Sequence, residues 1–237
     1  MEWADEGVVL AVRRLGESGV VASVLTREHG RHPGLVHGGA GKAKRGVLQP
    51  GNRVRAWWRS RLAEQLGSYR LELVQAHAAD LFDDPGPLAA LASACALCEV
   101  VLPERVPHAA AHAALVALLD ALGSESWPSV YVHWELALLR DLGYGLDLTQ
   151  CAATGANDGL AFVSPKSGRA VSLSAGEPYR DKLLVLPPFL VKGGEGDRAA
   201  VFEGLKLSGF FLDHHVLVPH HLVMPAARSR LVDRFRP

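Results

Sequence analysis

Hydrophobic and polar residues alternate in short runs along the first 80 residues, and glycines separate the runs. Alternation with a period of two is typical of β-strands that have one buried face. The pattern predicts five strands, over residues 7–14, 19–27, 30–37, 52–61 and 68–75. Five strands at this spacing favour a small antiparallel sheet closed into a barrel.

Beyond residue 80 the apolar residues recur at helical spacing instead. Three stripes predict helices over residues 88–102, 115–122 and 130–142, and a further helix is compatible with residues 199–213. A segment rich in Gly, Ser, Asn and Pro, residues 147–178, is predicted to be irregular. The fold class is therefore α+β, with a barrel domain over residues 1–80 and a helical domain over residues 81–237.

Length and composition exclude some classes of protein. The chain has 237 residues, of which 49% are hydrophobic, so it can bury a full core and is not disordered over most of its length. The longest runs without a charge span 14 residues, short of the roughly 18 that a transmembrane helix needs. Glu2, Asp5 and Glu6 do not suit the basic start of a signal peptide, and three cysteines do not form a disulfide framework. We therefore expect a cytoplasmic protein.

The charges balance in number but are unevenly distributed. Lys and Arg total 25, as do Asp and Glu, which argues against a protein that coats polyanions over its whole surface. Residues 81–160 nevertheless hold 2 basic and 10 acidic residues, whereas residues 27–61 hold nine basic residues against Glu28 alone. A polyanion partner is therefore expected at the N-terminal barrel.

The fourth predicted strand has two chemically different faces. Because side chains of an extended strand alternate, Val54, Ala56 and Trp58 share a face suited to a core. The opposite face carries four guanidinium groups and one indole, from Arg53, Arg55, Trp57, Arg59 and Arg61. Cations that follow a phosphate backbone beside an aromatic ring on which a base stacks are typical of nucleic-acid binding. The alternative is a solvated outer face whose Trp is covered by the next domain.

A glycine-rich segment, residues 37–46, precedes this strand and contains Lys42, Lys44 and Arg45. Its small residues would let the backbone approach phosphates closely, although a mobile, solvated connection is the alternative. The segment does not match a P-loop or a dinucleotide fingerprint, so no nucleotide cofactor is predicted. No basic helix is available to read a DNA groove, which favours contact without sequence specificity.

Two histidine pairs lie near the C-terminus, His214 with His215 and His220 with His221. Neutral imidazoles can bind a transition metal, which would make a metal enzyme the least favoured alternative. Without a carboxylate-rich motif beside them, surface or interface histidines are the preferred interpretation.

Several short motifs in order along nearly the whole chain make it similar to the bacterial recombination mediator family RecO. In the N-terminal part these residues are Gly7, Val9, Leu10, Arg13, Gly16, Glu17, Leu25, Thr26, Gly30 and Leu48-Gln49-Pro50. In the C-terminal part they are Leu142-Gly143-Tyr144, Leu146-Asp147-Leu148, Cys151 and the segment 164–168.

The resemblance implies an OB-fold over the first 80 residues, followed by a helical domain. It also implies a non-enzymatic, nucleoid-associated protein of DNA repair that binds single- and double-stranded DNA and anneals complementary strands. The implied protein partners are RecR, the C-terminal tail of single-strand-binding protein and, indirectly, RecA. The candidate DNA-binding residues are Lys42, Lys44, Arg45, Arg53, Arg55, Trp57, Arg59, Arg61, Arg13 and Arg27. The alternative function is a protein-interaction adaptor whose OB-like barrel binds a protein instead of nucleic acid.

One departure from the family concerns zinc. Many relatives carry a module with four cysteines after the Leu-Asp-Leu segment. Here Cys151 remains, but Thr154, Ser172 and either Ser174 or Ala175 stand at the other three positions. One thiolate with hydroxyl groups does not make the closed sulfur site of structural zinc, so we predict that the chain has no zinc and no other cofactor.

Overall fold

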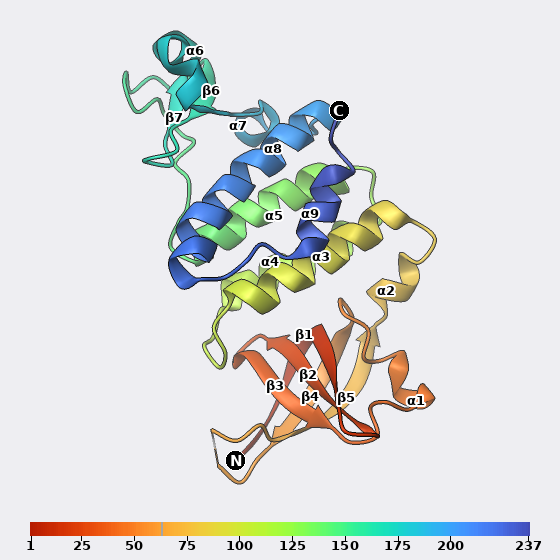
Figure 1. Cartoon of the computed structure of the whole chain (residues 1–237). Helices are drawn as coiled ribbons and strands as arrows, with labels where there is room; N and C mark the ends of the chain where they lie inside the picture. The colour runs from red at the N-terminus through yellow and green to blue at the C-terminus, as the bar shows by residue number, and fades with distance from the viewer. Residues whose placement is uncertain (63) are drawn as a thin grey trace. The chain divides into compact units, whose positions relative to one another are not determined.

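The computed structural model describes residues 1–62 and 64–237, which form two compact units. The first unit comprises residues 1–123 and 225–228, and the second comprises residues 124–224 and 229–237. Figure 1 shows the five-stranded barrel of the first unit and the helices and small sheet of the second.

The barrel confirms the five predicted strands and the α+β fold class. Its strands are β1 (Glu2–Leu15), β2 (Gly19–Thr26), β3 (Gly30–Val36), β4 (Arg53–Arg59) and β5 (Ser68–Gln75). They are ordered β1-β2-β3-β5-β4, and β4 pairs back with β1, which is the order of an OB-like barrel. The pairing is antiparallel except at the β3–β5 seam, where Leu35 and Ser68 form one parallel pair. The expectation of an entirely antiparallel sheet was therefore wrong at this seam.

Two strand ends differ from the prediction. β1 begins at Glu2, five residues before the expected start at Gly7, because Glu2 to Val8 pair with β4. β4 ends at Arg59, so Arg61 is not on the strand face to which its spacing assigned it. The apolar alternation is weak at both ends, and pairing with a distant strand sets the limits instead.

Residues 42–45 form a single helical turn, α1 (Lys42–Arg45), where a glycine-rich loop was expected. β5 is followed by three helices of the same unit, α2 (His77–Asp80), α3 (Pro85–Val101) and α4 (Ala109–Ala121). α3 begins at a cap in which the Asp84 carboxylate accepts a hydrogen bond from the Gly86 amide, with Pro85 in the first turn.

Helices α3 and α4 pack against β1 (Figure 1). Val8 and Leu10, on the outer side of β1, are buried there, and Cys95 of α3 donates to the Val9 carbonyl oxygen over 3.8 Å. The predicted boundary near residue 80 lies at the change from strands to helices, whereas the first compact unit continues through α4.

In the second unit, α5 (Trp127–Asp141) packs against α8 (Arg198–Phe211). Between them in sequence lies a small sheet with strand order β7-β6-β8, from β6 (Leu160–Val163), β7 (Ala170–Ser172) and β8 (Leu184–Val185). Part of the segment 147–178 therefore forms regular strands. The expectation that this segment is irregular was wrong for these strands. Strands of two to four residues are too short to show an alternation in the sequence.

The remaining short elements follow in chain order. They are α6 (Leu173–Gly176), η1 (Glu177–Lys182), α7 (Phe189–Lys192), the π-helix η2 (Leu212–Leu217), η3 (Val218–His220) and α9 (Ala226–Asp233). Among the helices of the described residues, none is both long and apolar enough to span a bilayer.

Candidate nucleic-acid interface

Strand β4 has the two faces that its sequence predicts. Val54, Ala56 and Trp58 are at most 3% exposed and belong to the barrel core. On the outer face Arg55 and Arg59 are exposed, while Arg53 and Trp57 are half-buried. Four of the five residues predicted for this face therefore lie in one row, and Arg61 continues past its end.

The strands on either side of β4 add acidic residues to this face, which sequence analysis of one strand missed. In the β1–β4 register, Glu2 lies opposite Arg59, and Glu6 lies opposite Arg55. On the other side, Glu72 of β5 also lies opposite Arg55. The Arg55 guanidinium is 3.6 Å from the Glu6 carboxylate. The outer face is therefore of mixed charge, and Arg55 is shared between solvent and a carboxylate.

Arg53 is held by the helical part of the same unit. Its guanidinium lies 3.9 Å from the Asp120 carboxylate of α4 and 3.5 Å from the Gln75 side-chain oxygen. Asp120 also lies 3.6 Å from Nε2 of the buried His77. Burial lowers the pKa of His77, and the neighbouring Asp120 opposes that shift. Arg53 therefore joins β4 to α4 and is less available to a ligand than Arg55 or Arg59.

A cavity of about 630 Å³ lies beside Trp57 on the outer face of β1, β4 and β5. Opposite Trp57 in the register are Ala4, whose side chain is small, and Arg70. The Arg70 guanidinium carbon lies 4.9 Å from the centre of the Trp57 ring, and Glu72 pairs with the same guanidinium at 2.5 Å. Arg70 is a functional candidate that sequence analysis missed, although its alternation with the buried Tyr69 placed it on the outer face of the strand.

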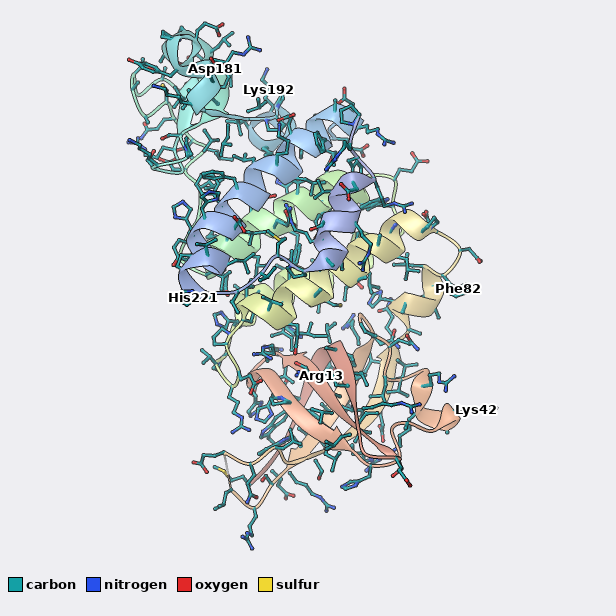
Figure 2. The ribbon with its side chains drawn as sticks, in the orientation of Figure 1. Arg13, Lys42, Phe82, Asp181, Lys192 and His221 are labelled. Atoms are coloured by element: carbon teal, nitrogen blue, oxygen red, sulfur yellow. The ribbon has the colours of Figure 1, made fainter. Side chains whose placement is uncertain are left out.

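One cation of α1 contacts a residue that lines this cavity. Lys42, Lys44 and Arg45 are all exposed, and Figure 2 shows Lys42 on the outer side of the barrel. The Lys44 ammonium donates to the His37 carbonyl oxygen over 2.7 Å, and His37 lines the cavity beside Trp57. This hydrogen bond connects α1 to the lining of the cavity beside Trp57.

The remaining predicted cations lie in different places. Arg61 and Arg59 line a second cavity, of about 560 Å³, at the end of β4. Arg27 is exposed in the β2–β3 turn, and its backbone amide donates to the Glu6 carbonyl oxygen. Arg13 lies on the part of β1 that does not pair with β4, 3.7 Å from Glu99 of α3 (Figure 2). Arg13 is therefore not brought into the β4 row.

Beside the outer face, the end of the barrel carries an aromatic cluster that sequence analysis missed. Trp3 stacks between His29 and Trp58, with ring centres 4.1 Å and 5.7 Å away. Burial also lowers the pKa of His32, which contacts Trp58 edge-on. The ring pairing joins β1, β3 and β4, so this cluster fixes the end of the barrel next to Glu2.

In the second unit, the residues at the predicted zinc-module positions come together without forming a metal cluster. The Ser172 amide and hydroxyl lie 3.2 Å and 3.4 Å from the Cys151 sulfur, and the Ser174 hydroxyl lies 3.5 Å from that of Ser172. Burial acts to raise the pKa of Cys151, but hydrogen bonds from Ser172, Thr154 and the Ala153 amide outweigh it and lower the pKa to about 6. Within residues 1–62 and 64–237, no three His, Cys, Asp or Glu side chains form a metal-binding group. Whether zinc is absent stays a prediction.

The first histidine pair packs against phenylalanine rings, whereas the second pair is exposed. His214 stacks on Phe210 and His215 on Phe211, with ring centres 4.1 Å and 5.3 Å apart. His220 and His221 are exposed in the turn that follows. These positions agree with the interpretation as surface histidines.

Comparison with known proteins identifies the family. The family model described as "Recombination protein O N terminal" matches residues 1–77, and the one described as "Recombination protein O C terminal" matches residues 83–222. The DNA repair protein RecO of Rhodospirillum centenum is 57% identical over 238 residues, covering 100% of this chain and 95% of the relative. RecO proteins of Rhodospirillum rubrum and Methylorubrum populi are 51% and 50% identical, covering 100% and 98% of this chain and 97% of each relative. The chain therefore belongs to the RecO family of DNA repair and recombination proteins.

Proposed function

We propose that the outer face of β1, β4 and β5 binds DNA without sequence specificity, as part of a recombination mediator. The observation that carries the proposal is the solvent-facing row of Arg55, Trp57 and Arg59 on a strand whose other face is sealed in the core. A buried opposite face holds the row in one plane, which suits a ligand that runs across a sheet.

Binding would proceed through phosphates first. Arg55, Arg59 and Arg61, together with the cations of α1, would neutralise the strand, so affinity would depend on salt and tolerate any sequence. Annealing would follow because two strands held at one cationic surface repel each other less. No covalent step is required, and the proposal includes no enzyme activity, no zinc and no other cofactor.

The proposed partners follow from family membership. They are single- and double-stranded DNA, RecR, the acidic C-terminal tail of single-strand-binding protein and, indirectly, RecA. Residues 81–160 hold 10 acidic residues against 2 basic ones, which suits a protein contact better than a DNA contact. Exposed cations of the last third of the chain, such as Arg180 and Lys182, are candidates for the acidic tail.

Fluorescence anisotropy of a labelled oligothymidine tests the DNA site. The triple variant Lys44→Ala, Arg55→Ala, Arg59→Ala removes three exposed cations of the proposed interface. If five cations contact phosphates in the unmodified chain, the slope of log affinity against log salt is about −3.5, and losing three of them reduces it to about −1.4.

A matched control removes the same charge elsewhere, through Arg180→Ala, Lys182→Ala and Arg236→Ala, three exposed cations of the second unit. This control should keep both affinity and slope. Unchanged binding by the Lys44, Arg55 and Arg59 variant would show that the site lies elsewhere.

Strand annealing tests the mediator function itself. Complementary strands coated with single-strand-binding protein should anneal in the presence of the chain without ATP, and annealing by the triple variant should be slower.

A protein-interaction adaptor is the second candidate function, favoured by the carboxylates of Glu2, Glu6 and Glu72 among the arginines. Lack of any oligonucleotide binding at low salt would support the adaptor.

A further inference from the structure

We propose that the cavity beside Trp57 is a subsite for one unpaired nucleobase, and that it makes the site prefer single strands to duplex DNA. This inference rests on the proposed DNA-binding function and adds a selectivity to it. Its evidence is the set of residues that line the cavity, the Arg70 guanidinium over the Trp57 ring and the distribution of charge around both.

The lining of the cavity suits a flat ring. It has a volume of about 630 Å³ and is lined by Trp57 and Arg70 on β4 and β5, and by Ala4 on β1. Ala4 lies directly opposite Trp57 in the register, so a small side chain stands where a larger one would fill the space. The half-buried Trp57 keeps its ring at the cavity while the strand fixes its position.

The Trp57 ring is already used to hold a flat, delocalised group. The Arg70 guanidinium lies over it at 4.9 Å from the ring centre, and Glu72 binds the same guanidinium. Arg70 is exposed, so a nucleobase can displace it from the ring or stack on its outer side. In both cases the base gains an aromatic or guanidinium plane, and either contact is independent of base identity.

The charges around the cavity favour a base at one position and phosphates at another. Glu2 lines the cavity beside Trp57, where its carboxylate repels phosphate but can accept hydrogen bonds from the amino groups of bases. Arg59 lines both this cavity and the neighbouring one, in which Arg61 also lies. A strand would therefore place a base at Trp57 and its phosphates along Arg59 and Arg61.

Duplex DNA cannot use this subsite. Its bases are paired and stacked on one another, so only their edges are accessible in the grooves, whereas the phosphates remain exposed. The arginines would consequently contact the phosphates of both forms of DNA, whereas Trp57 would stack on the bases of unpaired strands alone. After annealing, the product would lose the stacking contact and keep only the phosphate contacts.

The test compares affinities for a single strand and a duplex of equal length at one salt concentration. Trp57→Ala should weaken single-strand binding by about 5-fold to 100-fold, the effect of losing one stacked base, and change duplex binding less than about twofold. Trp57→Phe, which keeps an aromatic ring, should retain most of the single-strand affinity. Because Trp57→Ala removes no charge, the salt slope should stay the same.

Ala4→Leu is the second variant, because it fills the cavity opposite Trp57 while leaving every charge and the ring in place. It should reproduce the loss for single strands and spare the duplex. Equal losses on both DNA forms, or no loss on either, would overturn the subsite. The proposed function would still stand if the Lys44, Arg55 and Arg59 variant lost both forms, and it would fail separately if that variant bound as before.

Discussion

The candidate DNA-binding residues differ in how tightly neighbouring side chains hold them. Arg59 is exposed next to two cavities, Arg55 is shared with Glu6, and Arg53 is paired with Asp120 of α4. An arginine already facing a carboxylate must weaken that contact to reach a phosphate. We therefore expect the arginines of this row to contribute unequally to the proposed DNA binding.

Glu6→Gln should strengthen DNA binding. The substitution removes the carboxylate 3.6 Å from Arg55, so this guanidinium becomes free to contact a phosphate. We expect tighter binding at low salt and a slope of log affinity against log salt that is steeper by less than about 0.7 for single strands, because Arg55 already contributes part of one phosphate contact. Glu17→Gln, the same change in the turn between β1 and β2, should leave the slope as it is in anisotropy titrations. Equal effects of the two variants would mean that net charge alone, and not the Arg55 contact, controls binding.

Cys151 should titrate far below the buried thiol of Cys95. Hydrogen bonds lower the pKa of Cys151 to about 6, whereas burial raises that of Cys95 to about 12. Thiolate absorbance in the ultraviolet should therefore show a thiolate at neutral pH. Ser172→Ala removes a hydroxyl 3.4 Å from the sulfur and should raise this pKa. Ser174→Ala, whose hydroxyl contacts that of Ser172, is the control and should have the smaller effect.

The barrel and helix α3 meet closely at a glycine of the loop before β4. Gly51 has a φ of +87°, and a Cβ atom there would lie 2.6 Å from the side chain of Leu91 on α3. Leu91 is 2% exposed, so it has no free space into which to move. The Gly51 amide also donates to the Val9 carbonyl oxygen of β1. The contact between helix and barrel thus depends on the absence of a side chain.

Gly51→Ala should lower the free energy of unfolding by on the order of 2–4 kcal/mol, from overpacking against Leu91 together with left-handed backbone strain. Gly16→Ala separates the two causes, because Gly16 has a φ of +66° but, among the described residues beyond its chain neighbours, none comes within 4 Å of where a Cβ would lie. We expect about 1–2 kcal/mol for this control, from strain alone. Urea unfolding of both variants checks the difference, and similar losses would exclude the Leu91 contact as the cause.

Across the whole molecule, several buried histidines link stability to pH. Burial lowers the pKa of the buried His32 and His77 and of the half-buried His112 below the ordinary value of 6.5. The unfolded chain therefore binds protons more readily than the folded chain as the pH falls through this value. The stabilisation from neutral, buried imidazoles is complete at higher pH and is lost in acid.

We expect the urea midpoint of unfolding to be lower at pH 5.5 than at pH 7.5, since these values bracket the ordinary histidine pKa of about 6.5. His77→Gln should reduce this difference, because it removes a buried imidazole that faces Asp120, Arg53 and Asp80. His220→Gln, at an exposed position, should leave it unchanged. A midpoint that does not fall in acid would show that buried histidines do not control the pH dependence.

Short-range patterns in the sequence were enough to identify the five strands, the main helices and the two faces of β4. Side-chain direction alternates along any extended strand, so Val54 and Arg55 had to point to opposite sides wherever the strand lay. Motif order was likewise enough for the family. None of these inferences needed knowledge of a distant partner.

Long-range pairing was needed for the rest of the candidate interface. The neighbours of β4 depend on which strands flank it and in which register. They include the carboxylates of Glu2 and Glu6, the Arg70 guanidinium over the Trp57 ring, and the space that the small Ala4 side chain leaves opposite Trp57. The position of Arg13 beside Glu99 depends on the packing of α3 on the barrel. Such neighbours are far apart along the chain, and their contacts arise only when the sheet closes, so no local pattern carries them.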